Sequence, residues 1–148
     1  TTTPLKGKLQ KSKDVPKIIA AHDPTYVATA SASFPLDFHD KVKKAIDMKG
    51  MKYIHIHTPC PSGWGMEERY AIKIGKLAVN TGLYELYEVE NGKKTFSSPS
   101  AKLLNRKSLP RVTEYFKMQS RFRSLSDDFL AGLQEEIDVR WDGYRQTM

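Results

Sequence analysis

The residue of this chain best suited to chemistry is its single cysteine, Cys60, in the segment T-P-C-P-S-G-W-G of residues 58–65. A thiolate can attack an electrophile or bind a metal, and the prolines on both sides of Cys60 restrict the backbone that carries it. One sulfur cannot hold zinc or an iron–sulfur cluster alone, because such sites need four ligands. Taken by itself, the cysteine is either one ligand of a shared metal site or, more commonly, a buried and inert thiol.

The histidines are the next candidates. His55 and His57 alternate along an expected strand, so both imidazoles point to the same face, where a pair can bind a metal or transfer protons. No carboxylate or third histidine shares their spacing, so we expect packed or solvent-exposed rings rather than a site. His22 and His39 are isolated. The sequence contains no Ser-His-Asp arrangement, P-loop or G-x-G-x-x-G phosphate loop.

Upstream of Cys60, the apolar residues predict helices and strands in alternation. Asp14 is a typical N-cap residue and Pro16 suits a first helical turn, while Asp23-Pro24 interrupts that helix. We expect helices over residues 14–22, 35–48 and 67–81, and strands over residues 26–30 and 51–58. This order is typical of parallel α/β crossovers, which would place Cys60 at the carboxyl edge of the sheet, where open α/β folds carry their sites.

The pattern changes after Gly82. Residues 83–89 alternate in polarity, Glu90-Asn91-Gly92-Lys93 is a turn sequence, and Thr95-Phe96 can return as a second strand. We expect a polar, extended surface segment over 97–108, a short helix over 110–118 and a long last helix capped by Ser126. The apolar positions expected to pack along that last helix are Phe129, Leu130, Leu133, Ile137 and Trp141.

The composition limits the class of protein. The chain has 148 residues, 39% of them hydrophobic, so it can build a core. It has no apolar run long enough for a membrane span and no secretory signal pattern, and a single cysteine is typical of the reducing cytoplasm. The opening Thr1-Thr2-Thr3-Pro4 has no initiator Met, and we expect a fragment.

The charge is strongly basic. Lysine and arginine total 24 against 17 acidic residues, a net charge of +7, which favours an acidic partner. The stretch from Lys102 to Arg123 interleaves cations with Tyr115, Phe116 and Phe122, as nucleic-acid binders do. No known nucleic-acid motif accompanies it, so a protein-docking or solvated face is the commoner outcome.

Several segments, in order along the chain, resemble the beta subunit of 2-oxoacid:ferredoxin oxidoreductases, in the pyruvate synthase group. They are the opening T-T-T-P, K-D-V-P-K-I-I-A-A-H, Y-V-A-T-A-S, H-x-x-T-P-C-P-x-G-W, I-G-x-L-A-V-x-T-G-L-x-x-L-Y-E and E-Y-F-K-x-Q-x-R-F-R. The chain departs from the family pattern at Asp23 and Ser120, where glycine is usual. The resemblance runs from end to end.

The resemblance implies an α/β fold. Residues 1–82 would form the C-terminal half of a thiamine-diphosphate-binding domain with parallel strands and crossover helices, and residues 83–148 a hairpin and a helical C-terminal extension. Cys60 would be the fourth ligand of a [4Fe-4S] cluster, and the residues that keep its loop rigid would be Pro59, Pro61, Gly63 and Trp64. The family's G-D-G motif, its Asn-rich metal–diphosphate loop and three other cluster cysteines lie upstream of this stretch, outside the chain.

The resemblance also implies a function. The parent enzyme would convert a 2-oxoacid and CoA to acyl-CoA and CO2 and reduce ferredoxin, using thiamine diphosphate, Mg2+ and [4Fe-4S] clusters. Pyruvate is the first expectation, with branched-chain oxoacids or oxalate as alternatives. The partners would be the alpha, gamma and delta subunits or equivalent domains, ferredoxin and the N-terminal half of the beta subunit, with no nucleic acid and no membrane. The isolated chain would be inactive. The competing hypothesis is a basic, non-enzymatic nucleic-acid-binding or structural fragment.

Overall fold

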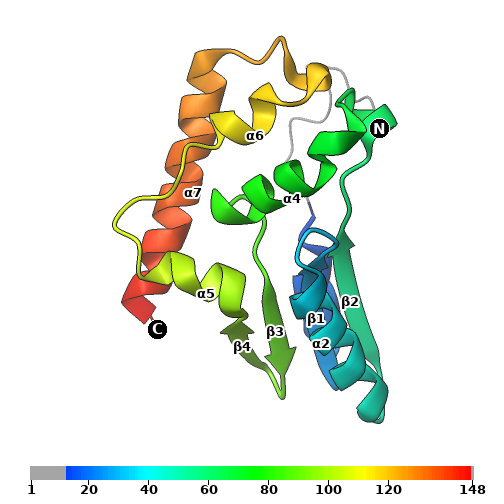
Figure 1. Cartoon of the computed structure of the whole chain (residues 1–148). Helices are drawn as coiled ribbons and strands as arrows, with labels where there is room; N and C mark the ends of the chain where they lie inside the picture. The colour runs from blue at the N-terminus through cyan, green and yellow to red at the C-terminus, as the bar shows by residue number, and fades with distance from the viewer. Residues whose placement is uncertain (1–12, 148) are drawn as a thin grey trace.

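A computed structural model describes residues 13–147 of the chain as a four-stranded sheet beside a group of helices (Figure 1). The opening T-T-T-P segment of the resemblance lies outside the described residues. The class is α/β, as expected from the sequence.

The sheet is mixed: the two strands before Cys60 are parallel and the later pair forms a hairpin, both as expected, and the hairpin joins the sheet beside the first strand. Its strands lie in the order β2 (Lys52–His57), β1 (Tyr26–Ser31), β3 (Tyr87–Glu90) and β4 (Lys93–Phe96). β1 and β2 are parallel, with Thr29 beside His55, whereas β3 is antiparallel to both β1 and β4.

The direction of β3 follows from the course of the helix before it. Helix α4 (Ala71–Asn80) packs against helices of the C-terminal part and does not run back along the sheet (Figure 1). The chain is therefore still near the carboxyl end of β1 when β3 begins, and Glu88 pairs with Ala28. A strand that enters the sheet from that end must run antiparallel to β1.

The first two helices form where they were expected. Helix α1 (Val15–Ala20) is capped by Asp14, whose carboxylate accepts a hydrogen bond from the Lys17 N–H at 3.1 Å. Helix α2 (Pro35–Asp47) begins with a proline and covers one face of β1, where Ala45 packs with Tyr26 and Ala28.

The segment after β2 is more helical than expected. The predicted loop over 59–65 contains a short helix, α3 (Pro61–Trp64), and the helix predicted from residue 67 begins with the 3₁₀ turn η1 (Glu68–Tyr70) before α4. Pro61 has the fixed φ angle of a helical first turn, and Gly65 at φ +62° ends that turn in the left-handed region that favours glycine.

The expected extended segment over 97–108 is wrong. Most of it is helix α5 (Ser98–Leu104), in which Leu103 is buried and the Ser100 hydroxyl accepts a hydrogen bond from the Leu86 N–H at 2.8 Å. Only two of its residues, Ser100 and Leu103, are buried, so its sequence carries no repeated apolar pattern that would predict a helix.

The last part of the chain is helical. It comprises α6 (Thr113–Lys117), the 3₁₀ turn η2 (Ser120–Phe122) and α7 (Asp127–Thr147), which is capped by the Ser126 hydroxyl as expected. Phe129 was expected to pack but is 54% exposed, because it lies on the outer side of the first turn of α7. Among residues 13–147, no helix combines the length and apolar character that crossing a lipid bilayer requires.

The main core lies between the hairpin and the four C-terminal helices α4 to α7. Trp141 is fully buried there: its ring stacks on Phe96 at 5.2 Å between centres, and its indole N–H donates to the Gly82 carbonyl at 3.0 Å. The core under α2 is much smaller. The cysteine segment follows β2 and contacts the main core through Trp64, which packs against the edge of that core.

Candidate cysteine site

Cys60 follows the carboxyl end of β2 and immediately precedes α3. Its thiol is exposed, so it is not the buried, inert cysteine that isolated occurrences favour. The Trp64 N–H donates to the Cys60 carbonyl at 2.9 Å, which closes the turn of α3. A β-carbon at position 63 would lie 3.0 Å from the Cys60 sulfur. Because residue 63 is glycine, the sulfur can lie close to the backbone there.

Two donors near the sulfur favour the thiolate. The backbone N–H of Gly63 is the larger influence, and the Ser62 hydroxyl, 3.8 Å from the sulfur, is the second; together they hold the pKa of the Cys60 thiol below its usual value. An exposed thiol with a lowered pKa is suited to bind a metal or to react.

Cys60 is the only cysteine of the chain, so its titration can be followed by alkylation. We expect the rate with iodoacetamide to rise with a midpoint below the value of about 8.5 typical of a free cysteine, because only the thiolate reacts. Ser62→Ala is expected to move that midpoint upward, whereas Ser124→Ala, at another exposed serine, leaves it unchanged. A midpoint at or above that of a free thiol would show that Gly63 and Ser62 do not lower the pKa of Cys60.

A segment far along the chain holds the cysteine loop from the other side. The Ser120 N–H donates to the Gly65 carbonyl at 3.0 Å, and the Arg121 guanidinium carbon lies 4.2 Å from the centre of the Trp64 ring. Spacing in the sequence did not predict this contact. Ser120 and Arg121 lie within the motif E-Y-F-K-x-Q-x-R-F-R of the family resemblance, but the resemblance implies no role for that motif.

The two strand histidines share one face, as predicted, and are packed among aromatic rings. The His57 ring centre is 5.0 Å from that of Tyr84 and 5.8 Å from that of Trp64. Burial, helped by the nearby His55 and Arg121, lowers the pKa of His57 to about 4, so this ring is neutral at pH 7. Within residues 13–147, no three side chains of the metal-ligating types gather. His57 therefore packs against Trp64 of the cysteine loop, and the described residues supply no third ligand beside the two histidines.

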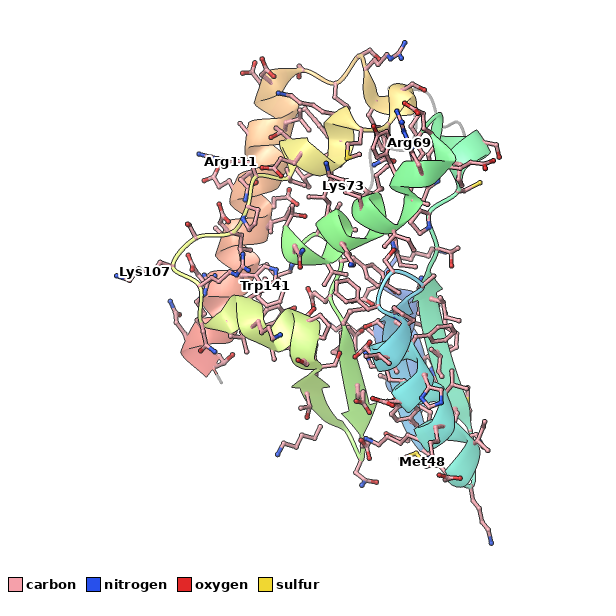
Figure 2. The ribbon with its side chains drawn as sticks, viewed as in Figure 1. Met48, Arg69, Lys73, Lys107, Arg111 and Trp141 are labelled. Carbon is pink, nitrogen blue, oxygen red and sulfur yellow. The ribbon has the colours of Figure 1, made fainter. Side chains whose placement is uncertain are left out.

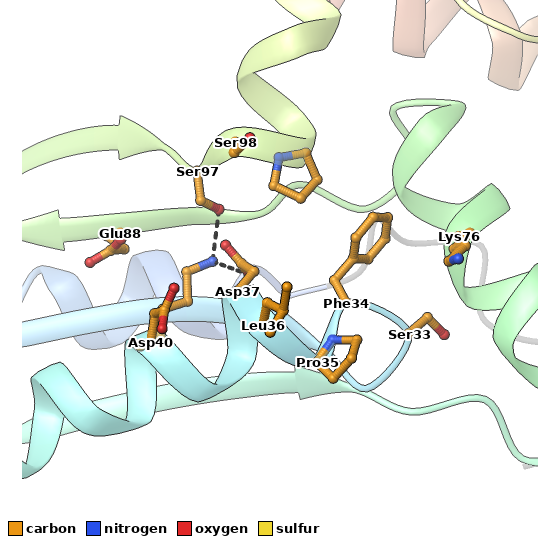
Figure 3. A pocket seen from close by; sticks show the side chains of 12 residues that line it. Ser33, Phe34, Pro35, Leu36, Asp37, Asp40, Lys76, Glu88, Ser97 and Ser98 are labelled. Atoms are coloured by element: carbon orange, nitrogen blue, oxygen red, sulfur yellow. Dashed lines mark hydrogen bonds and ion pairs between the residues drawn. The ribbon is translucent and has the colours of Figure 1, made fainter.

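A groove of about 630 Å³ lies between α2 and the start of α5 (Figure 3). Lys41, 2% exposed, donates from Nζ to the Thr29 carbonyl, the Asp37 carboxylate and the Ser97 hydroxyl, at 2.7–2.8 Å. Burial lowers the pKa of Lys41, and the bonded Asp37 opposes that shift. All three ammonium donors are used inside the protein. Lys41 therefore ties α2 to β1 and α5, and it offers no free donor to a ligand.

The basic stretch has exposed charges but buried aromatics. Lys102, Arg106, Lys107 and Arg111 are exposed and form no ion pair with another described residue; Figure 2 shows Lys107 projecting from the connection between α5 and α6. The aromatic residues instead contact one another, with Tyr115 and Phe116 5.2 Å apart and Phe116 and Phe122 4.8 Å apart. Rings that pack inside the protein cannot stack on bases, which disfavours the nucleic-acid hypothesis.

Comparison with known proteins shows what the chain is similar to. No protein-family model matches the sequence. The chain is 44% identical over 144 residues to pyruvate synthase subunit PorB of Methanocaldococcus jannaschii, and 36% identical over 151 residues to PorB of Thermotoga maritima. It is 36% identical over 130 residues to ketoisovalerate oxidoreductase subunit VorB of Pyrococcus furiosus. The chain is therefore similar to PorB and VorB subunits.

The match covers this chain almost completely and its relatives only in part. It includes 95% of this chain and 46% of the Methanocaldococcus PorB, 96% and 45% for the Thermotoga PorB, and 88% and 40% for the Pyrococcus VorB. The chain thus spans a little less than half the length of these PorB and VorB subunits. This similarity confirms the resemblance to oxidoreductase subunits and disfavours the nucleic-acid-binding alternative.

Proposed function

We propose that this chain is part of the beta subunit of a 2-oxoacid:ferredoxin oxidoreductase, which converts a 2-oxoacid and CoA to acyl-CoA and CO2 and reduces ferredoxin. The observation that carries the proposal is identity of 36–44% with subunits named for pyruvate synthase and ketoisovalerate oxidoreductase, over 88–96% of the chain. We place the protein in the cytoplasm, because one cysteine without a disulfide partner is typical of a reducing compartment.

We assign Cys60 as one ligand of a [4Fe-4S] cluster. The exposed thiol with its lowered pKa fits a metal-bound thiolate, and the other three ligands must come from outside residues 13–147. When bound, such a cluster carries single electrons. In this chain, Pro59 and Pro61 would restrict the loop, while the Gly63 N–H would donate to the thiolate sulfur.

We assign the thiamine diphosphate and Mg2+ ligands to the remaining part of the subunit. The described residues bring together no cluster of three histidine, cysteine or carboxylate side chains that could hold a metal ion. The isolated chain is therefore expected to be inactive, and no step of the thiamine chemistry is derived from its residues.

The sheet supports the proposal that residues 1–82 are half of a larger domain. Within residues 13–147, β2 pairs only with β1, and its Ile56 is 42% exposed. On the same side of the sheet, Ile46 of α2 is 73% exposed. A parallel strand is usually paired on both edges and covered on both faces, so we propose that the rest of the beta subunit completes the sheet beside β2.

Pyruvate is the proposed substrate, because the relatives named for pyruvate synthase reach 44% identity and those named for ketoisovalerate reach 36%. The test uses the complete beta subunit assembled with its partner subunits. Reduction of ferredoxin is measured with pyruvate and ketoisovalerate in the presence of CoA, and with oxalate without CoA, because oxalate is oxidised to CO2 and leaves no acyl group. We expect the highest kcat/KM with pyruvate. Absence of ferredoxin reduction with all three would refute the proposed activity.

We propose further that the exposed cations between α5 and α6 attract an acidic ferredoxin. Replacing Lys102, Arg106, Lys107 and Arg111 by serine is expected to slow ferredoxin reduction more at low salt than at high salt, since salt screens exposed charges. For a charge-matched comparison, Arg106→Ser with Lys107→Ser is set against Lys43→Ser with Lys49→Ser, at exposed positions on and after α2. Equal salt dependence in both double variants would eliminate this docking site.

A further inference from the structure

Arg121 occupies a position between two aromatic rings beside the cysteine loop. Its guanidinium carbon lies 4.2 Å from the centre of the Trp64 ring and 4.4 Å from that of Phe122. Trp64 belongs to the short helix that Cys60 precedes, whereas Phe122 belongs to the C-terminal part and packs on Phe116. Arginine stacks well in such a sandwich because its guanidinium is planar and weakly hydrated.

The arginine is held in this position from behind. Its Nε donates to the Gln119 side-chain oxygen at 3.1 Å, and the amide nitrogen of Gln119 donates to the Tyr115 carbonyl at 2.9 Å. Gln119 is only 1% exposed, so this bond is protected from water. Since the neighbouring Ser120 N–H binds the Gly65 carbonyl, the whole segment is fixed to the loop that carries the thiol.

The charge of Arg121 is not neutralised by a carboxylate among the described residues. This charge is fixed beside the cysteine loop, because Arg121 contacts Trp64 of the short helix that follows Cys60 and the adjacent Ser120 N–H donates to the Gly65 carbonyl. A cation fixed near a metal–thiolate group stabilises the more negative, reduced form of that group.

We propose that Arg121 is a positioning residue that holds the Trp64 side of the cysteine loop in place and whose charge raises the reduction potential of the cluster bound by Cys60. This inference rests on the proposed function, because it requires that Cys60 bind the cluster. Residues 119–122 would thereby have a role in electron transfer that their sequence does not indicate.

The test is an iron analysis and a redox titration, followed by electron paramagnetic resonance, of the complete complex. The signal to follow is the one lost in Cys60→Ala. In Arg121→Gln we expect the ratio of reduced to oxidised cluster at a fixed potential to fall about tenfold, which is a shift of about 59 mV for one electron. Arg121→Lys keeps the charge and is expected to recover most of the potential. Arg123→Gln, at an exposed arginine two residues away, is the matched control.

The outcomes separate the two proposals. An unchanged potential with full iron in Arg121→Gln, or an equal shift in Arg123→Gln, overturns the role of Arg121 and leaves the ligand assignment intact. If Arg121→Gln loses the cluster and Arg121→Lys keeps it at nearly the original potential, the positioning role is supported. Full iron and an unchanged spectrum in Cys60→Ala overturn the ligand assignment and this inference with it.

Discussion

Replacing Cys60 with alanine in the complete complex is expected to remove about one four-iron cluster per active site, because a cluster that loses one of four thiolates is exposed to water and oxygen. Ferredoxin-linked turnover should fall by orders of magnitude, since electrons leaving the thiamine would have to pass this cluster. Thiamine binding should largely survive, because its ligands are assigned to the rest of the subunit. Iron analysis, electron paramagnetic resonance and thiamine determination on the purified variant check the three parts of this prediction.

Two comparisons make the result specific to the thiol. Cys60→Ser supplies a weaker oxygen ligand, and we expect a retained but altered cluster. Ser62→Ala keeps the thiol and removes one of its donors, and we expect full iron. If Cys60 were merely structural, Cys60→Ala would change stability by roughly 1 kcal/mol and leave the iron untouched. Full iron occupancy with an unchanged spectrum would therefore exclude Cys60 as a ligand.

Trp141→Ala is expected to lower the free energy of unfolding of the chain by about 3–5 kcal/mol, the usual effect of deleting a buried tryptophan. The indole is fully buried, stacks on Phe96 and donates to the Gly82 carbonyl, so the substitution leaves a cavity and removes one of the two hydrogen bonds to that carbonyl, the other coming from Arg140. Urea denaturation followed by far-UV circular dichroism measures the change.

Val139→Ala is the control for this prediction, because Val139 lies on the same helix and is 65% exposed. Its expected effect is within about 0.5 kcal/mol of zero. Trp141→Phe should fall between the two variants, since it preserves ring packing and loses the hydrogen bond. A loss below about 1 kcal/mol in Trp141→Ala would show that the core does not depend on this side chain.

Features that depend on neighbouring residues were predictable from the sequence. Asp14 and Ser126 cap their helices with hydrogen bonds to N–H groups three residues ahead, so the signal and the structure lie within one turn. Asn91 and Gly92, with φ angles of +49° and +74°, form the tight turn that their residue types indicate and place β3 beside β4. The family, and through it the proposed role of Cys60, also came from short ordered motifs.

The tertiary structure decided what depends on residues far apart in the chain. Helix α5 contacts Leu86 through Ser100, and its short sequence gave no periodic signal for that contact. β3 runs antiparallel to β1 because α4 leaves the chain near the carboxyl end of the sheet. Arg121 reaches Trp64 across 57 residues of sequence, and neither residue type nor spacing specifies such a pair. Local backbone chemistry therefore determined most element boundaries in this protein, whereas long-range packing determined the strand direction and the surroundings of the cysteine.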